Sequence, residues 1–105
     1  MGNAVVVFIT VPSAKEGRKL GSILVRKKLA ACVNRVPGIH STYWWKGKID
    51  KAREELLMLK TMRSKMPALI KEVKRVHSYT VPEIIAVPIA QGNADYLKWI
   101  CSSLK

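Results

Sequence analysis

The stretch ACVNRVPGIHSTYWWKGKIDKAREELLMLKTM, residues 31–62, decides the fold of this chain. Residues 31–45 are predicted to form one strand, with a bulge or kink at Pro37 and Gly38 because neither residue suits the interior of a regular strand. The chain then turns around Gly47, and residues 49–62 are predicted to return beside the first strand. The sequence therefore predicts a β-hairpin that is long for a chain of 105 residues.

The length of this hairpin has a consequence for assembly. The second strand, residues 49–62, would extend over roughly 45 Å at about 3.3 Å per residue, whereas a domain of about 100 residues is nearer 35 Å wide. Part of the hairpin should therefore extend beyond the domain, and that part carries Tyr43, Trp44, Trp45 and Ile49. An exposed edge of this composition favours contact with another chain, so the three aromatic residues are predicted to lie at a subunit interface. The alternative is a hairpin that folds back on its own sheet.

A strand and a helix are predicted before the hairpin. Residues 4–11 are apolar and β-branched, which is typical of a buried strand. Ser13 and Glu16 have the spacing of a capping box, and the helix that they begin should run to about residue 29. Four residues recur on its inward face: Gly17, Leu20, Gly21 and Leu24. Since each glycine costs about 1 kcal/mol relative to alanine in a helix, glycines on this face indicate close packing against a sheet.

Two helices and a strand are predicted after the hairpin. Ser64 is expected to cap a second helix that tolerates Pro67 in its first turn. Residues 82–89 should form a fourth strand, in which Pro88 requires an edge position or a bulge. Asn93 is expected to cap a terminal amphipathic helix. The apolar positions of the second helix are Met66, Leu69, Ile70, Val73 and Val76, and those of the terminal helix are Leu97, Ile100, Cys101 and Leu104.

The order of elements is strand, helix, strand, strand, helix, strand and one added helix. This order predicts an α+β fold of the ferredoxin-like βαββαβ type, with an antiparallel sheet, helices on one face, a long central hairpin and an extra C-terminal helix. The length suits one domain, residues 1–105, and no apolar run approaches the roughly 20 residues that cross a bilayer. Two cysteines, Cys32 and Cys101, suit a reducing compartment. The first residues lack the basic region and apolar core of a secretory signal, so the chain as given is expected to be either cytosolic or already processed, and the predicted location is cytoplasmic.

The chain carries a formal net charge of +12, from 19 Lys and Arg and seven Asp and Glu. Such a charge raises nucleic acid and other polyanions as partners, but the basic residues are scattered along the chain, which favours a solvated surface. RNA-binding RRM domains share the predicted strand order and stack bases on aromatic residues of the strand that corresponds to residues 55–62. That segment, ELLMLKTM, has no aromatic residue, which argues against nucleic acid as the partner.

Catalytic motifs are absent from the sequence. It contains no Walker loop, GxGxxG, GxSxG or HExxH. Cys32 with His40 or His77 would be a conceivable thiol and base, but buried free cysteines are common. The sequence therefore predicts a protein that is not an enzyme.

A metal site is the stronger chemical hypothesis. His77, Tyr79 and Glu83 lie within seven residues of one another at a predicted helix-to-strand junction. Histidine with a carboxylate suits copper, zinc or nickel, although a complete site needs three or four ligands. The structural alternative is that His77 ends its helix, Glu83 pairs with a lysine and Tyr79 packs between subunits.

Six passages resemble proteins of the CutA family in sequence, order and spacing. They are LAACVN at 29–34, PG at 37–38, YWWKGKI at 43–49, LKT at 59–61, HSYTVPEIIAVPI at 77–89 and GNADYLKW at 92–99. The resemblance extends over residues 5–104. It implies a ferredoxin-like subunit of a homotrimer, with PII-like clefts between subunits, a role in divalent cation (copper) tolerance, and no settled catalytic reaction. A non-catalytic small-ligand sensor or a scaffold for a protein partner is the alternative.

The resemblance also assigns residues. The copper site of bacterial members uses a cysteine late in the first strand and two adjacent histidines, and the matching positions here are Ile9, Val76 and His77. His77 and Glu83 are therefore the predicted ligands for a divalent cation. The predicted cleft-lining residues are Cys32, Lys60 and Tyr79.

Overall fold

Four strands form one antiparallel sheet in the order β2-β3-β1-β4, which is the ferredoxin-like order predicted from the sequence. The computed structural model describes residues 3–105, so the predicted domain of residues 1–105 is described except for its first two residues. Its elements are β1 (Ala4–Val11), α1 (Ala14–Arg26), β2 (Cys32–Trp45), β3 (Lys48–Met62), a short 3₁₀ helix (Arg63–Lys65), α2 (Met66–Val76), β4 (Ile84–Pro88) and α3 (Ala94–Ser103).

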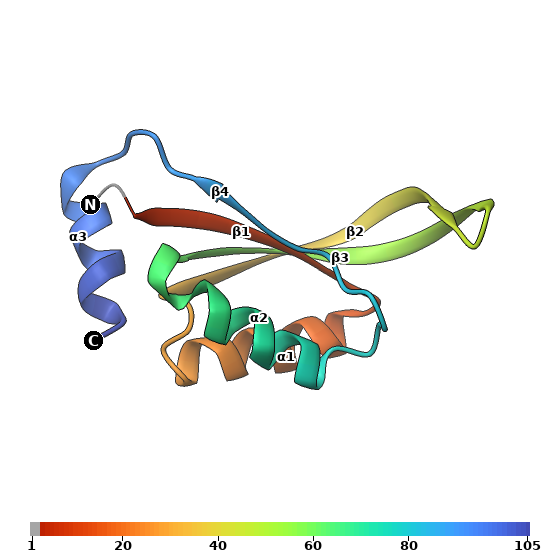
Figure 1. Ribbon diagram of the computed structural model, residues 1–105, viewed down its shortest axis with the longest axis horizontal. Helices are drawn as coiled ribbons and strands as arrows, with labels where there is room; N and C mark the ends of the chain where they lie inside the picture. Colours follow the sequence, from red (N-terminus) through yellow and green to blue (C-terminus); the bar gives the residue numbers. More distant parts are fainter. Residues whose placement is uncertain (1–2) are drawn as a thin grey trace.

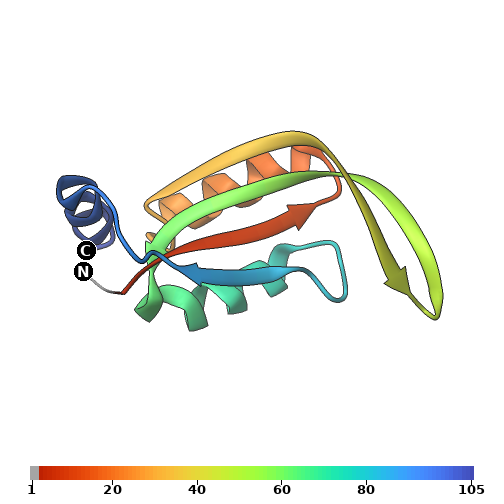
Figure 2. The ribbon, with the colours of Figure 1, turned by 90° about the horizontal axis from the view of Figure 1, so that it is seen from above.

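The helices are distributed unequally around the sheet. Helices α1 and α2 lie side by side beneath one face, as predicted, while α3 packs at one end of the molecule (Figure 1). The view from the other side shows the strands in front of both helices, so the second face of the sheet is left open by these helices (Figure 2). No helix among residues 3–105 has the length and apolar character needed to cross a membrane.

Strand β1 and helix α1 match their prediction closely. The Ser13 side chain accepts a hydrogen bond from the Glu16 backbone N–H at 3.2 Å, as an N-cap should, but the Glu16 carboxylate accepts from the Ser78 N–H instead of returning to Ser13. The helix ends at Arg26, earlier than predicted, because Lys28 has a φ of 57° in the left-handed region. The predicted inward residues Gly17, Leu20, Gly21 and Leu24 are all buried.

The long hairpin also confirms its prediction. The pairing of β2 with β3 shifts in register between Val36 and Ile39, around Pro37 and Gly38. Strand β1 pairs with β3 only at residues 55–62, so the rest of β3 pairs with β2 alone. We call residues 39–54, which extend beyond β1, the hairpin arm. It accounts for a long axis of 44 Å in a molecule that is 25 Å and 23 Å across (Figure 1).

The predicted cap of the second helix is wrong. Residues 63–65 form a 3₁₀ turn that leads directly into α2, and Lys65 occupies the N-cap position without a side-chain hydrogen bond. Ser64 lies inside this turn, so its backbone cannot take the extended conformation that an N-cap residue needs. Pro67 is in the first turn of α2, as predicted.

Two predictions for the C-terminal third hold with small changes. Strand β4 is shorter than the predicted residues 82–89, and Pro88 lies in it at the edge of the sheet. Asn93 caps α3 by accepting a hydrogen bond from the Asp95 N–H at 3.0 Å. Ile100 of α3 and Leu104, which directly follows the helix, are buried against Ala4 at the start of β1, and together they form a second, smaller core at that end of the sheet.

The two faces of the sheet differ in cover. The face that α1 and α2 cover holds the main core, whose strand residues are Val5, Val7, Ile9, Val11, Leu57 and Leu59. The opposite face, here called the open sheet face, presents the alternate residues of the same strands: Val6, Phe8, Val36, Leu56, Met58, Ile85 and Val87. Ile85 and Val87 are about half exposed, at 53% and 47%. An apolar sheet face without a covering layer is typical of a surface that contacts another molecule.

Candidate functional site

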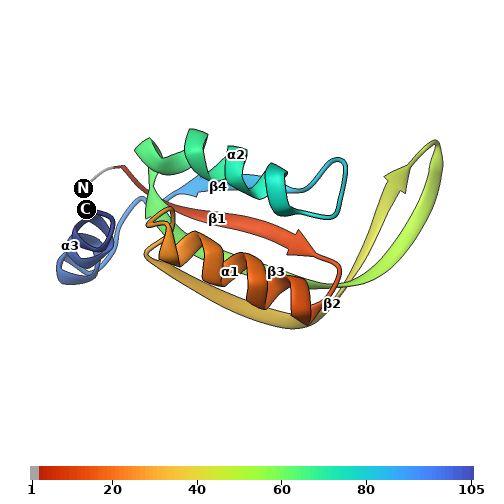
Figure 3. The same ribbon diagram turned by 90° about the horizontal axis from the view of Figure 1, so that it is seen from below.

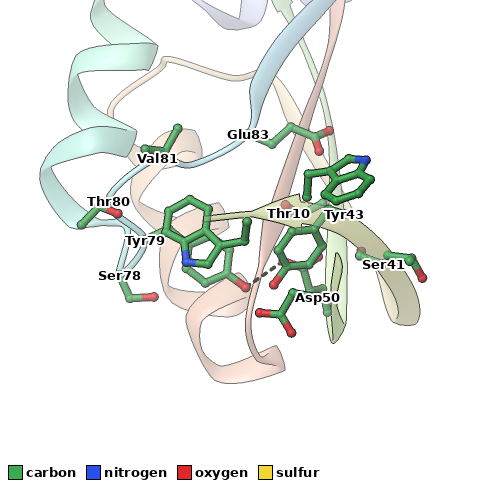
Figure 4. Close-up of a pocket in the computed structure, with 13 residues that line it drawn as sticks. Thr10, Ser41, Tyr43, Asp50, Ser78, Tyr79, Thr80, Val81 and Glu83 are labelled. Carbon is green, nitrogen blue, oxygen red and sulfur yellow. Dashed lines mark hydrogen bonds between the residues drawn. The ribbon is translucent and has the colours of Figure 1, made fainter. Parts of the chain in front are cut away.

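The main pocket lies between the hairpin arm and the loop that connects α2 to β4. It has a volume of ≈ 810 Å³ (Figure 4). Four aromatic residues line it, Tyr43, Trp44, Trp45 and Tyr79, together with three carboxylates, Asp50, Glu54 and Glu83. None of its lining residues is Lys or Arg, although the chain carries 19 of them. The pocket is therefore acidic and aromatic in a strongly basic protein.

The register of the arm places the carboxylates. Asp50 lies directly opposite Tyr43 in the pairing of β3 with β2. Asp50 and Glu54 are four residues apart on β3, and side chains on a strand alternate between faces, so both point to the same side of the arm. Glu83 comes from the connecting loop just before β4. The pocket thus depends on tertiary contact between two segments that are distant in sequence.

A hydrogen bond joins the two walls of the pocket. The Tyr79 hydroxyl donates to Glu54 Oε2 at 2.7 Å, and Glu54 is only 7% exposed (Figure 4). Burial, followed by this bond to the carboxylate, raises the pKa of Tyr79 well above its ordinary value. Burial and the nearby charges of Asp50 and Glu54 raise the pKa of Tyr43. The only O–H proton of Tyr79 is thus used in the bond to Glu54. The Tyr43 hydroxyl has no hydrogen bond to another residue within 3–105, so it is the phenol that can donate to a bound ligand.

His77 does not line the pocket but fixes the start of the loop that connects α2 to β4. Its ring Nε2 lies 2.8 Å from the Thr10 carbonyl oxygen, and its Nδ1 accepts from the Tyr79 N–H at 3.0 Å. A carbonyl can only accept and an amide N–H can only donate, so these partners define a neutral ring with the proton on Nε2. The His77 side chain is fully buried, with the Glu16 carboxylate at 3.4 Å from Nδ1. Both ring nitrogens are engaged, and a metal at His77 would have to displace one of these partners.

The predicted ligand pair is thus divided. Glu83 is exposed and lines the pocket, whereas His77 is buried outside it. No group of three or more His, Cys, Asp or Glu side chains within residues 3–105 is arranged to hold a metal ion. Residues 3–105 of one chain therefore supply no complete set of metal ligands, and metal binding by His77 and Glu83 stays a prediction.

The predicted cleft-lining residues lie in two places. Tyr79 lines the pocket, but Cys32 and Lys60 are paired opposite each other at the far end of the sheet. There Lys60 Nζ and Cys32 Sγ both donate to Asn34 Oδ1, the thiol at 3.6 Å. Burial, and then the neighbouring Cys32, raise the pKa of Tyr96 on α3. Cys32 and Lys60 therefore form a separate polar cluster on the open sheet face.

The three predicted interface residues are exposed on the arm. Trp44 is 73% exposed, Trp45 is 43% exposed and Tyr43 is 39% exposed. Sequence reasoning missed Asp50 and Glu54 as pocket residues. The sequence did contain a signal for them. In the predicted hairpin Asp50 comes to lie opposite Tyr43, and Glu54, four residues further along the same strand, points to the same side.

The fold and the pocket together define an α+β, ferredoxin-like domain that carries an extended aromatic hairpin arm beside an acidic pocket. The family model described as CutA1 divalent ion tolerance protein matches residues 5–103. The chain belongs to the CutA1 divalent ion tolerance family, as the resemblance of its sequence motifs predicted.

Individual relatives agree with this assignment. The divalent-cation tolerance protein CutA of Thermus thermophilus is 50% identical over 95 residues, which is 90% of this chain and 92% of the relative. The chloroplastic protein CutA 1 of Oryza sativa is 49% identical over 97% of this chain, and the chain spans only 58% of that relative's length.

Solved structures show the same fold. The crystal structure of CutA1 from Oryza sativa superposes with a TM-score of 0.93 at 50% identity, covering 96% of this chain and 93% of the other. The periplasmic divalent cation tolerance protein CutA from Archaeoglobus fulgidus gives a TM-score of 0.94 at 42% identity, covering 97% of this chain and 99% of the other.

Proposed function

We propose that this chain acts in divalent-cation tolerance as a non-catalytic homotrimer whose subunits cover one another's hairpin arms and open sheet faces. The observation that carries the proposal is the hairpin arm, which extends beyond β1 and leaves Trp44 and Ile49 73% and 61% exposed. The role in cation tolerance rests on family membership, and the number of subunits rests on the resemblance to CutA proteins.

The physical argument for assembly is the amount of apolar surface without cover. The aromatic end of the arm and the open sheet face are both exposed in one chain. Large exposed apolar patches mark interaction sites, because burying them yields about 25 cal/mol for each Å² removed from water. Since both patches recur on every copy, contact between copies is the simplest arrangement that covers them.

The assembly is tested by the sedimentation of variants. The native chain at micromolar concentration is expected to sediment at three times its chain mass of 11.8 kDa. A double change at the arm, Trp44→Lys with Ile49→Lys, should shift the population toward single chains because it places two charges in the proposed contact. Lys51→Ser, an exposed change on the same arm, is the matched control. A native chain that sediments as a monomer would refute the proposal.

For the metal, we propose weak binding of a divalent cation such as copper, in which Glu83 is the accessible member of the predicted pair. Glu83 is exposed at the pocket, and no basic residue lines the pocket beside it. His77 contributes indirectly by fixing the loop through Thr10 and Tyr79. A complete ligand set would need donors from a neighbouring subunit, since residues 3–105 of one chain supply too few.

Calorimetric titration with copper tests this role. Glu83→Gln should weaken binding relative to the native chain. Asp95→Asn, which removes an exposed carboxylate at the start of α3 and away from the pocket, should not. Equal isotherms for the native chain and Glu83→Gln would remove Glu83 as a ligand. Copper binding that also includes His77 predicts a further loss in the double variant His77→Ala, Glu83→Ala.

The pocket supports a second candidate function, a non-catalytic sensor of a small ligand. Its volume of ≈ 810 Å³ lies in the range of small-molecule sites. Its carboxylates and aromatic rings favour a cationic ligand, and Lys60, which would have attracted an anion, lies elsewhere on the sheet. Thermal-shift assays distinguish a cationic from an anionic ligand, because a ligand that binds only the folded state raises the melting temperature. Organic cations should raise it, and nucleotides, which are anions, should not.

A further inference from the structure

The outer side of the helix layer is strongly basic. Residues 14–28 and 65–76, which contain α1 and α2, hold ten of the 19 Lys and Arg but only two of the seven acidic residues. This one layer therefore carries eight of the twelve net positive charges of the chain. The exposed members are Lys15, Arg18, Lys19, Arg26, Lys27, Lys28, Lys71, Lys74 and Arg75, and we call this surface the basic helix face. Figure 3 shows α1 and α2 side by side in front of the sheet.

The two acidic residues of this layer do not offset the charge of the remaining bases. Glu72 accepts from Lys27 at 2.8 Å and from Arg75 at 2.7 Å, and these bonds lower its pKa to about 2. Glu16 is turned toward the connecting loop, where it accepts from the Ser78 N–H at 3.1 Å. The other exposed bases of α1 and α2 have no carboxylate within ion-pair distance in the part of the chain that the structure describes.

The shape and composition of the face select among anionic partners. Neither segment contains an aromatic residue, so the face offers no platform on which single-stranded bases could stack. Both helices lie flat against the sheet, so neither protrudes in the manner needed to enter the major groove of a duplex (Figure 3). The main pocket is lined by other elements. One aliphatic side chain on each helix, Val25 and Ile70, is exposed among the bases, at 42% and 37%.

We propose that the basic helix face docks on membrane surfaces that contain anionic phospholipids. A flat array of lysines and arginines suits a plane of phosphate headgroups, and shallow aliphatic side chains can contact the acyl boundary beneath them. The face lies on the opposite side of the sheet from the open sheet face (Figures 2 and 3). Docking therefore leaves the proposed subunit contacts free, and it does not depend on the proposed function.

Vesicle co-sedimentation of the full chain tests the proposal. The chain is expected to bind phosphatidylcholine vesicles that contain phosphatidylglycerol and not vesicles of phosphatidylcholine alone. Binding should fall steeply as salt is raised, because the screening length shortens from about 8 Å at physiological ionic strength to about 3 Å at 1 M. Each basic residue near an anionic surface strengthens binding about fivefold, so the triple variant Lys19→Gln, Lys71→Gln, Lys74→Gln should bind roughly 100-fold more weakly.

A control with the same net charge separates this face from the bulk charge of the chain. The triple variant Lys48→Gln, Lys51→Gln, Lys98→Gln removes three exposed lysines from the arm and α3, and it should bind anionic vesicles within about threefold of the native chain. Equal loss in both triple variants would overturn the proposal, because it would show only a general attraction. Binding of a DNA duplex that depends on the same three helix lysines, without binding to anionic vesicles, would replace the membrane with nucleic acid.

Discussion

Replacing Tyr79 with phenylalanine isolates the bond that joins the two walls of the pocket. The change removes the hydroxyl that donates to Glu54 at 2.7 Å and leaves a carboxylate that is only 7% exposed without its described donor. A hydrogen bond to a charged group contributes about 1.5–3 kcal/mol, and an unsatisfied buried partner adds to the cost of losing it. Tyr79→Phe should therefore lower the free energy of unfolding by about 2 kcal/mol.

The assay is equilibrium unfolding in urea, with circular dichroism as the signal and all variants at one chain concentration, because assembly makes stability depend on concentration. About 2 kcal/mol corresponds to a drop in melting temperature of roughly 10 °C for a domain of this size. Tyr43→Phe is the matched control. It removes the same atom from the same pocket, but the Tyr43 hydroxyl has no hydrogen bond to another residue within 3–105, so the cost should stay within about 0.5 kcal/mol.

Tyr79→Phe should also change how stability depends on pH in alkaline solution. Because the pKa of Tyr79 is raised above 10.0 in the folded state, its contribution to stability is complete below pH 10 and is lost as the pH rises through the folded pKa. Tyr79→Phe lacks this group, so its stability should decline less steeply above pH 10 than that of the native chain. The stabilising hydrogen bond between Tyr79 and Glu54 would be refuted if Tyr79→Phe lowered the free energy of unfolding by less than about 0.5 kcal/mol and its stability above pH 10 declined like that of the native chain.

Further changes test the packing of α1, the acid sensitivity of α2 and the cap of α3. Gly17→Ala should destabilise the fold by about 2 kcal/mol, measured by urea unfolding, because an added Cβ would overlap the buried Glu55 carboxylate, which Arg35 holds in place through both oxygens. Gly21→Ala is the comparison, and it should be near neutral because the tight contact of the added Cβ with a Val33 methyl at 3.3 Å is offset by the higher helix propensity of alanine. The ionised Glu72 stabilises the native chain fully above pH 4.5, and this contribution is lost as the pH falls from 4.5 towards about 2. The stability of Glu72→Gln should therefore fall less than that of the native chain over this pH range. Asn93→Ala should cost about 1 kcal/mol through loss of the N-cap, and an unchanged midpoint would argue against that cap.

Local patterns predicted most of the fold. The continuous apolar and β-branched run of residues 4–11, followed by Pro12, predicted β1 with its observed bounds. The glycines of α1 were placed correctly because glycine weakens a helix, and here close approach to the sheet requires it: a Cβ at Gly17 or Gly21 would crowd Glu55 or Val33. Ser64 was misplaced because a 3₁₀ turn and an N-cap favour the same residue types, and backbone angles alone distinguish them.

The candidate site was predicted less well because it is made by tertiary contacts. His77 and Glu83 are close in sequence, but the ring of His77 is drawn to the Thr10 carbonyl, 67 residues away. The bond from Tyr79 to Glu54 likewise joins residues 25 positions apart on different elements. Proximity along the chain predicted a pair, whereas the path of the connecting loop determines which side chains meet.

The arrangement of the strands also constrains how the chain folds. Strands β2 and β3 are neighbours in sequence, so their ribbon can close within microseconds, whereas β4 reaches β1 only after most of the chain is available. The long separation between Val5 and its partner Pro88 predicts that this last pairing limits the refolding rate. The hairpin arm, with its exposed aromatic residues, would then be present on early, partly folded chains. Because exposed apolar surface on such chains leads to aggregation, the refolding yield should fall as the chain concentration rises.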